Sequence, residues 1–229
     1  MSANTPIDRV RRSKDAARAT YDSLSRIYDV LSGGFERRLR ERGLGLLAAR
    51  DGERALEVGF GTGHGVLWLC RAVGPSGTVH GIDISGKMRD VAAARLALNG
   101  LSDRAELVVG DAVSMPWGGE SVDAIFMSFF LELLDTPEIP RFLSECARVL
   151  APGGRICAVG MSSEGEGGFV SSCYRFAHRH FERLVDCRPI RVERSLAEAG
   201  FAIEAKELHR VCGLPIEVVL SRKDGIRQQ

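Results

Sequence analysis

Two hydrophobic patterns divide the chain near residue 50. Before that point, apolar residues recur at helical spacing, which predicts one helix over residues 8–31 and a second from Phe35 to Ala49. After it, short runs rich in β-branched residues alternate with helical runs as far as Gly160. The strand-like runs do not alternate with period two, as expected for strands that are buried on both faces of a sheet.

The order of the expected elements predicts an α/β fold. Strands are expected at 55–58, 78–83, 105–110, 122–129, 155–160, 201–208 and 214–223, and helices at 64–73, 87–99, 137–150, 169–185 and 194–200. Alternating strands and helices form a parallel sheet with helices on both faces. We therefore expect a doubly wound, seven-stranded, mostly parallel sheet with an antiparallel last strand. Residues 1–50 would form an N-terminal helical cap, and residues 51–229 the main domain.

Composition and charge narrow the class of protein. The chain has 229 residues, 45% of them apolar and 27% charged, which is ordinary for a globular protein with a full core. Its net charge of +1 argues against nucleic acid as a partner. No apolar run approaches the ~20 residues of a membrane span, and the first residues lack the apolar core of a secretory signal. The six cysteines form no CxxC pair, so we expect reduced thiols in the cytoplasm and no metal site.

The sequence Glu-Val-Gly-Phe-Gly-Thr-Gly, residues 57–63, joins a predicted strand to a predicted helix. Glycines allow a tight turn and a close approach of a ligand to the backbone, and a helix N-terminus attracts anionic groups. The spacing departs from the dinucleotide fingerprint G-x-G-x-x-G, because its sixth position is His64 counted from Gly59 and Val66 counted from Gly61. The Lys-Ser/Thr pair of a phosphate-binding loop is also missing.

Acidic residues close the next two predicted strands at the same edge of the sheet. Asp83 follows Gly59 at about the spacing of a ribose-binding carboxylate, and its two oxygens suit two vicinal hydroxyls. Asp111 and Ala112 follow the third strand. Each feature alone is weak evidence, whereas the ordered set is specific.

In combination with the turn in Arg-Val-Leu-Ala-Pro-Gly-Gly-Arg-Ile, these motifs resemble class I S-adenosylmethionine-dependent methyltransferases, over residues 21–223. The resemblance implies a Rossmann-like methyltransferase fold, S-adenosyl-L-methionine as cofactor and S-adenosyl-L-homocysteine as product. It also implies that the glycine turn contacts the amino-acid end of the cofactor, Asp83 the ribose, and Asp111 with Ala112 the adenine. The cofactor-binding residues so implied are Tyr28, Glu57, Gly59, Gly61, Gly63, Asp83, Ile84, Met88, Asp111, Ala112 and Ser128.

The acceptor side is less well defined. Two Tyr-Asp pairs seven residues apart resemble the helix that covers the cofactor in ubiquinone/menaquinone C-methyltransferases, which makes Tyr21 a candidate for the acceptor pocket and Tyr28 for the methionine end. Both tyrosines would equally suit core anchors. Glu132 follows the fourth strand at the ligand edge. It could act as a base, orient a cationic amine or simply begin a helix.

Two functions remain open at this point. One is methyl transfer to a small molecule, such as a quinone, another aromatic or a lipid-like acceptor. Such transfer needs alignment and exclusion of water, and needs a base only for a weak nucleophile. The other is a cofactor-binding protein without transfer, acting in regulation or assembly. The helix expected around 165–190 would serve as an acceptor cap or as a packing helix. The Arg-rich and aromatic helices at both ends would suit a homodimer or a peripheral membrane contact.

Overall fold

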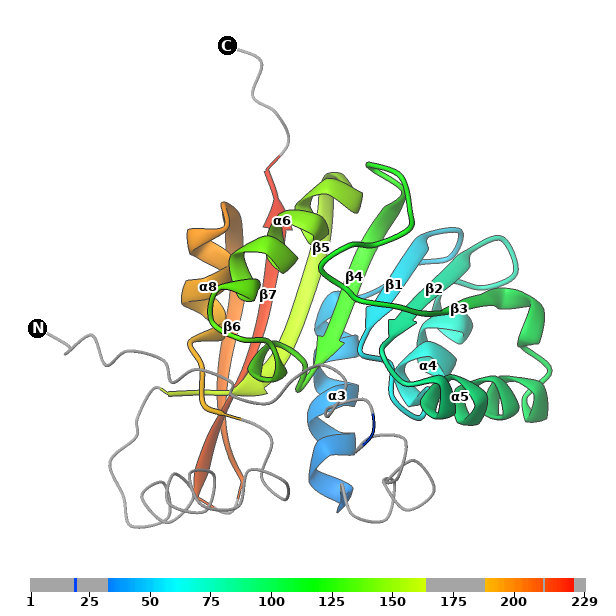
Figure 1. Cartoon of the computed structure of the whole chain (residues 1–229), viewed down its shortest axis with the longest axis horizontal. Coiled ribbons are helices and arrows are strands. Elements are labelled where there is room, and N and C mark those ends of the chain that lie inside the picture. The colour runs from blue at the N-terminus through cyan, green and yellow to red at the C-terminus, as the bar shows by residue number, and fades with distance from the viewer. Residues whose placement is uncertain (1–18, 20–32, 164–187, 212, 225–229) are drawn as a thin grey trace, which may run out of the picture.

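The structure is a computed structural model of the whole chain, and it describes residues 19, 33–163, 188–211 and 213–224 (Figure 1). The helix predicted over 169–185 lies outside these residues, as do Tyr21 and Tyr28 and nearly all of the helix predicted over 8–31. The domain boundary near residue 50 stays a prediction.

The described residues form one seven-stranded sheet in the order β3-β2-β1-β4-β5-β7-β6. Its strands are β1 (Arg54–Val58), β2 (Thr78–Asp83), β3 (Ala105–Val109), β4 (Val122–Ser128), β5 (Leu150–Met161), β6 (Phe201–Val211) and β7 (Leu214–Lys223). Strand β7 runs antiparallel to both of its neighbours, and the other adjacent strands pair in parallel. The predicted fold class is therefore confirmed.

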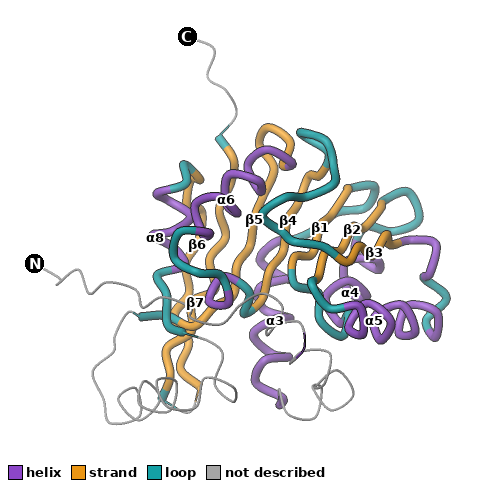
Figure 2. The backbone as a smooth tube through the Cα atoms, viewed as in Figure 1, coloured by secondary structure: helices purple, strands orange, loops and turns teal. Residues whose placement is uncertain are grey.

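Helices cover both faces of this sheet (Figure 2). They are α3 (Gly33–Leu47), α4 (His64–Ala72), α5 (Gly86–Leu98), α6 (Glu138–Val149) and α8 (Val192–Glu198), with the short 3-10 turns η1 (Ser102–Arg104) and η2 (Leu131–Leu133). One face buries Leu44 of α3, Leu69 of α4 and Leu96 of α5. The other face buries Phe142 of α6 and Leu196 of α8. The α-helices predicted within the described residues are confirmed to within about two residues at either end.

Helix α3 lies in the predicted cap region and packs directly on the sheet. Gly43 allows this close approach, since a Cβ atom there would lie 2.7 Å from Cγ2 of Val159. Where the helix ends, Arg155 of β5 donates a hydrogen bond to the carbonyl of Leu47 and pairs with Glu53. Arg155 thus satisfies a carbonyl that a helix end leaves without an intrahelical partner. The end of α3 is tied to β5 by this buried contact.

Strand β5 begins earlier than predicted. The expected Ala-Pro-Gly-Gly turn is an irregular stretch inside the strand, because Val122 pairs with Leu150 whereas Ala124, two residues on, pairs with Arg155. Gly153 in this stretch has a φ of 72°, a left-handed conformation that glycine adopts without strain. The prediction was wrong here because the glycines mark a bulge within the strand rather than a turn before it.

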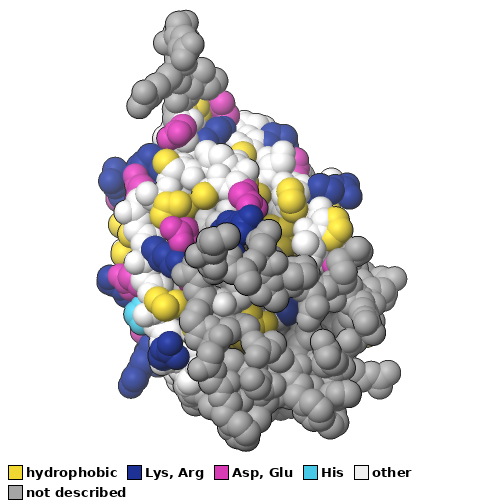
Figure 3. All heavy atoms as spheres, turned by 90° about the vertical axis from the view of Figure 1, so that its left-hand side faces the viewer, with side chains coloured by type: hydrophobic (Ala, Val, Ile, Leu, Met, Phe, Trp, Pro, Cys, Tyr) yellow, Lys and Arg dark blue, Asp and Glu magenta, His cyan; other side chains and the backbone are white. Residues whose placement is uncertain are grey.

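On the face that carries β6 and α8, basic and acidic side chains are interspersed over the described residues (Figure 3). Arg194 pairs with Glu198, and Arg222 pairs with Glu204. Mixed charge of this kind is typical of a solvated surface. Within the described ranges, no helix combines the length and the apolar character that crossing a membrane would require.

Candidate cofactor site

The parallel strands end at one edge of the sheet, the lower edge in Figure 1. In open α/β sheets, ligands bind outside this edge. The predicted cofactor residues follow three strands that are neighbours in the sheet: the glycine turn follows β1, Asp83 ends β2 and Asp111 follows β3. The structure therefore brings the three predicted motifs together.

The glycine turn has a left-handed backbone at three alternate positions. The φ angle is 68° at Gly59, 50° at Gly61 and 80° at Gly63, values that glycine adopts readily. Two of these positions also lack room for a side chain: a Cβ atom would lie 2.6 Å from Cδ2 of Phe130 at Gly59 and 2.6 Å from Cβ of Ala92 at Gly63. At Gly61, no heavy atom of the described residues lies within 4 Å of such a Cβ. Gly61 is therefore where a ligand can approach the backbone.

Asp83 holds this turn in place. Its Oδ2 accepts a hydrogen bond from the backbone N–H of Gly61 at 2.9 Å, and its Oδ1 accepts one from the N–H of Ser85 at 2.9 Å. The N–H of Gly59 donates to the carbonyl of Ile82 at 2.8 Å, which ties the turn to β2 a second time. Each carboxylate oxygen can accept more than one hydrogen bond. A residue that orients the turn can therefore also face a ligand.

The residues predicted on the adenine side differ in exposure. Met88 and Ala112 are buried, with 1% and 6% of their surface exposed, whereas Ile84 and Asp111 are half-buried. The N–H of Met88 donates to the side chain of Ser85, which caps α5. Ile84 and Asp111 are thus accessible to a ligand, while Met88 and Ala112 pack behind them.

Arg148 fixes the segment that carries Asp111, and the sequence analysis did not find it. Residues 110–121 contain neither helix nor strand. Arg148 of α6 donates hydrogen bonds to the carbonyls of Trp117 and Met115, at 2.8 and 3.1 Å. Without a regular element of its own, this segment depends on α6 for its position.

Glu57 lies beneath the glycine turn. It is 3% exposed, and the backbone N–H of Val66 donates a hydrogen bond to its carboxylate. Val66 is in the first turn of α4, whose N-cap residue, Gly63, makes no side-chain cap hydrogen bond. The carboxylate of Glu57 therefore takes the place of a side-chain cap. Its predicted contact with the cofactor stays a prediction.

Burial also sets the electrostatics of Glu57. It raises the pKa of this carboxyl to about 8; the positive charge of Arg40 on α3 opposes the shift, and the negative charge of Asp83 adds to it. A Cβ atom at Gly65 would lie only 2.1 Å from Oε1 of Glu57. The glycine after the predicted motif is therefore also required, and its cause is the buried carboxylate.

Strand β4 ends at the half-buried Ser128, at the same edge as the glycine turn. The next residue, Phe129, has a φ of 53°, a conformation that is uncommon for a large side chain. Its N–H still donates to the carbonyl of Val159 at 2.7 Å. The ring of Phe130 then packs on Phe142, with 5.0 Å between the ring centroids. An unusual backbone conformation of this kind is often found at a functional site.

Glu132, a predicted catalytic candidate, lies in η2 and is 0% exposed. Its Oε1 accepts a hydrogen bond from the backbone N–H of Met161 at 2.8 Å. Burial raises the pKa of Glu132 to about 7, against the opposing effects of its backbone hydrogen bonds and of Arg188. Its catalytic role stays a prediction, and so do the roles of Tyr21 and Tyr28.

The described residues contain neither a cluster of metal ligands nor a reactive thiol. No group of three or more His, Cys, Asp or Glu side chains there is placed to hold a metal ion. Cys70, Cys146 and Cys157 are buried free thiols, and burial raises the pKa of each. Protonated, buried thiols are poor nucleophiles.

Comparison with known proteins shows what the central part of the chain is similar to. Residues 55–154, from β1 into β5, match the family described as "Methyltransferase domain". With the seven-stranded sheet and the glycine turn, this match confirms the resemblance to class I S-adenosylmethionine-dependent methyltransferases.

The similarity extends to particular proteins. The chain is 33% identical to demethylmenaquinone methyltransferase of Staphylococcus aureus (strain JH9) over 150 residues, which are 64% of this chain and 60% of the relative. The chain thus spans less than two thirds of the length of such curated relatives. This similarity confirms the predicted resemblance to the quinone-biosynthesis group.

Solved structures share the fold. The [4+2]-cyclase SpnF matches with a TM-score of 0.73 and 20% identity, over 97% of this chain and 100% of that one. A SAM-dependent methyltransferase from Aquifex aeolicus matches with a TM-score of 0.63 and 22% identity, over 86% and 97% of the two chains. One fold thus carries two differently named activities, so chemistry has to be argued from the site.

Proposed function

We propose that the chain is an S-adenosylmethionine-dependent methyltransferase that acts on a small molecule, with a quinone or a related aromatic compound as acceptor. The observation that carries the proposal is the open backbone at Gly61, which Asp83 holds at the ligand edge of the sheet. The methyltransferase-domain match over residues 55–154 supports the cofactor. The similarity to demethylmenaquinone methyltransferases supports the acceptor class.

The residues present fit this cofactor by their chemistry. Backbone groups at Gly61 suit the polar amino-acid end, and Arg40, whose charge acts on Glu57, is the cation we assign to the carboxylate of that end. Asp83 accepts hydrogen bonds from the ribose hydroxyls, and Asp111 accepts one from the adenine amino group. Ile84 supplies apolar contact beside the adenine ring.

S-Adenosylmethionine supplies a methyl group bound to a positively charged sulfur. The sulfur leaves as a neutral thioether, so the leaving group needs no acid. The chain's own task is to align the acceptor with that methyl group and to exclude water. The described residues near the edge suit this task, because Phe130, just after β4, packs against Gly59 of the glycine turn. The methyltransferase-domain match and the demethylmenaquinone methyltransferases support transfer, and neither supports the non-catalytic alternative.

The test is a transfer assay with the purified full chain and methyl-labelled S-adenosylmethionine. A demethylmenaquinone with a short isoprenoid tail serves as acceptor, and the label is partitioned between organic and aqueous phases. We expect label in the organic phase. Cofactor binding with no label in any quinone would refute the acceptor class, and absence of cofactor binding would refute the whole proposal.

Asp83→Asn tests the assignment of the site. We expect cofactor affinity to fall at least about tenfold, the effect of losing one hydrogen bond to a charged group. Asp90→Asn is the matched control, because the Asp90 side chain is 67% exposed on α5 and pairs with Arg89. Calorimetric titration measures the affinity, and thermal unfolding checks that both variants fold. Equal affinity in the two variants would contradict the assignment.

A further inference from the structure

Two short segments meet beyond the end of β5. The N–H of Ile190 donates to the carbonyl of Met161 at 2.9 Å, and the N–H of Ser163 donates to the carbonyl of Ile190 at 2.8 Å. Ser162 and Ile190 form a parallel bridge. Residues 161–163 and Ile190 therefore lie side by side at the end of β5, at the ligand edge of the sheet.

Three buried charged side chains hold this junction. Glu132 and Glu217 are 0% exposed, and Arg188 is 2% exposed. Glu132 binds the N–H of Met161. The hydroxyl of Ser162 donates to Glu217, and Arg188 donates to a carbonyl and a hydroxyl of the segment that follows η2. Buried charges are costly, and apolar side chains would often be as stable in their place. A role in fixing geometry accounts for them.

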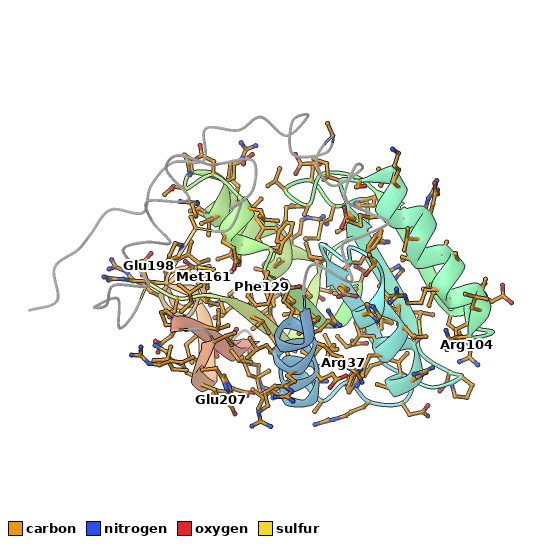
Figure 4. The ribbon with its side chains drawn as sticks, turned by 90° about the horizontal axis from the view of Figure 1, so that it is seen from below. Arg37, Arg104, Phe129, Met161, Glu198 and Glu207 are labelled. Atoms are coloured by element: carbon orange, nitrogen blue, oxygen red, sulfur yellow. The ribbon has the colours of Figure 1, made fainter. Side chains whose placement is uncertain are left out.

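The hydrogen bond to Glu132 takes the place of a backbone hydrogen bond between β4 and β5. Strand β4 pairs with β5 as far as Ser128, opposite Val159, and the N–H of Phe129 makes the last backbone bond between them. At Phe129 the backbone turns left-handed. Within the described residues, the next β5 donor on this side, the N–H of Met161, instead donates to the carboxylate of Glu132. Figure 4 shows Phe129 and Met161 at the adjacent strand ends.

We propose that Glu132 is a positioning residue, which holds the end of β5 in place after β4 has left the sheet, and is not the base of the reaction. The inference rests on the proposed methyl transfer for its functional meaning, and on geometry for its physical content. By holding Met161, Glu132 also sets the junction of Ser162 and Ile190 at the ligand edge of the sheet.

The surroundings of Glu132 argue against proton transfer to a ligand. Its Oε1 is taken by Met161. Its Oε2 has no hydrogen-bond partner among the described residues. A Cβ atom at Gly160 would lie 3.1 Å from this Oε2 and 3.0 Å from Cγ2 of Val192. The second oxygen therefore points under β5 towards α8, on the face of the sheet opposite to α3 and α4.

The test compares Glu132→Gln with Glu132→Ala in the full chain. Glutamine keeps an oxygen that can accept from Met161 but cannot act as a base at neutral pH, whereas alanine removes both. Glu198→Gln makes the same chemical change on the surface of α8, where the Glu198 side chain is 63% exposed. Hydrogen exchange of peptides that contain the Met161 and Ile190 amides reports the junction without any need for turnover.

We expect Glu132→Ala to raise exchange at both amides about tenfold, the effect of losing one hydrogen bond, and Glu132→Gln and Glu198→Gln to leave it near the wild-type rate. Methyl transfer by Glu132→Gln should stay within about threefold of wild type, and transfer by Glu132→Ala should fall further. Should Glu132→Ala not fold, Glu132→Met, which keeps most of the side-chain volume but removes the acceptor, should raise exchange at Met161 instead.

Two results would overturn the proposal. One is unchanged exchange in both Glu132→Ala and Glu132→Met. The other is loss of transfer in Glu132→Gln while exchange and cofactor affinity match wild type, since that combination identifies a base. A wild-type protein that binds cofactor but transfers no methyl group would refute the proposed function, and the exchange data would still decide whether Glu132 holds the junction.

Discussion

Glu57 of β1 and Glu132 of η2 are two buried glutamates. Each receives a hydrogen bond from a backbone N–H, that of Val66 or Met161, and each has an Oε2 without a hydrogen-bond partner among the described residues. Burial raises the pKa of the first to about 8 and of the second to about 7.

The two sites differ in what surrounds the carboxylate. Glu57 is packed against the first turn of α4, so that a Cβ atom at Gly65 would nearly coincide with Oε1, at 2.1 Å. Around Glu132 the fit is looser, with 3.1 Å from Oε2 to a Cβ atom at Gly160. The same chemical group thus supports the start of α4 in one place and the end of β5 in the other, and the packing around Glu57 is tighter.

The largest expected effect follows from the tighter packing. Gly65→Ala places a methyl group inside contact distance of the Glu57 carboxylate, and we expect a loss of about 3 kcal/mol in the free energy of unfolding. Denaturant unfolding measures it. Glu57→Ala makes room for the new methyl group, so the double variant should lose less than the sum of the two single variants. Strict additivity would show that Glu57 does not cause the need for glycine.

The next effect concerns pH. A carboxyl whose pKa is higher in the folded than in the unfolded protein stabilises the fold while it is protonated, and this contribution is lost as pH rises through the folded pKa. The pH range over which stability is lost runs from the usual carboxyl pKa of 4.5 to the raised pKa, which is about 8 for Glu57 and about 7 for Glu132. Arg40 and Asp83 act on the first group, and Arg188 and Glu36 on the second.

Stability should therefore fall, on the order of a few kcal/mol, as pH rises between about 5 and 8. Glu57→Gln should make this decline shallower up to about pH 8, and Glu132→Gln should do so only up to about pH 7. Unfolding in urea at several pH values measures both, with Glu198→Gln as the surface control. An identical slope in wild type and both buried variants would mean that neither carboxyl titrates as the structure indicates.

Sequence reasoning succeeded where a residue's role depends on its own strand or turn. Gly59, Gly61 and Gly63 were identified because a tight turn demands glycine, and the structure gives all three a positive φ. Asp83 was identified from its spacing, but its hydrogen bond to Gly61 depends on two strands meeting.

The missed features depend on contacts between distant segments. Gly65 is required by a carboxylate on β1, and Arg148 holds a segment about thirty residues earlier in the chain. Glu132 had three open roles because its partner, Met161, lies on the next strand. No local pattern in the sequence encodes such pairings, whereas helix and strand periods are local and were predicted well.

The smallest expected effect tests the looser packing. Gly160→Ala brings a Cβ atom to 3.1 Å from the carboxylate of Glu132 and 3.0 Å from Val192, so the neighbours must move by a few tenths of an ångström. Glycine inside a strand is itself unfavourable by roughly 0.5–1 kcal/mol, and the two effects should offset to within about 1 kcal/mol. Denaturant unfolding beside Gly65→Ala measures the difference. A loss as large as that of Gly65→Ala would mean that Glu132 is packed as tightly as Glu57, and the contrast between the two glutamates would then lie in their hydrogen bonds alone.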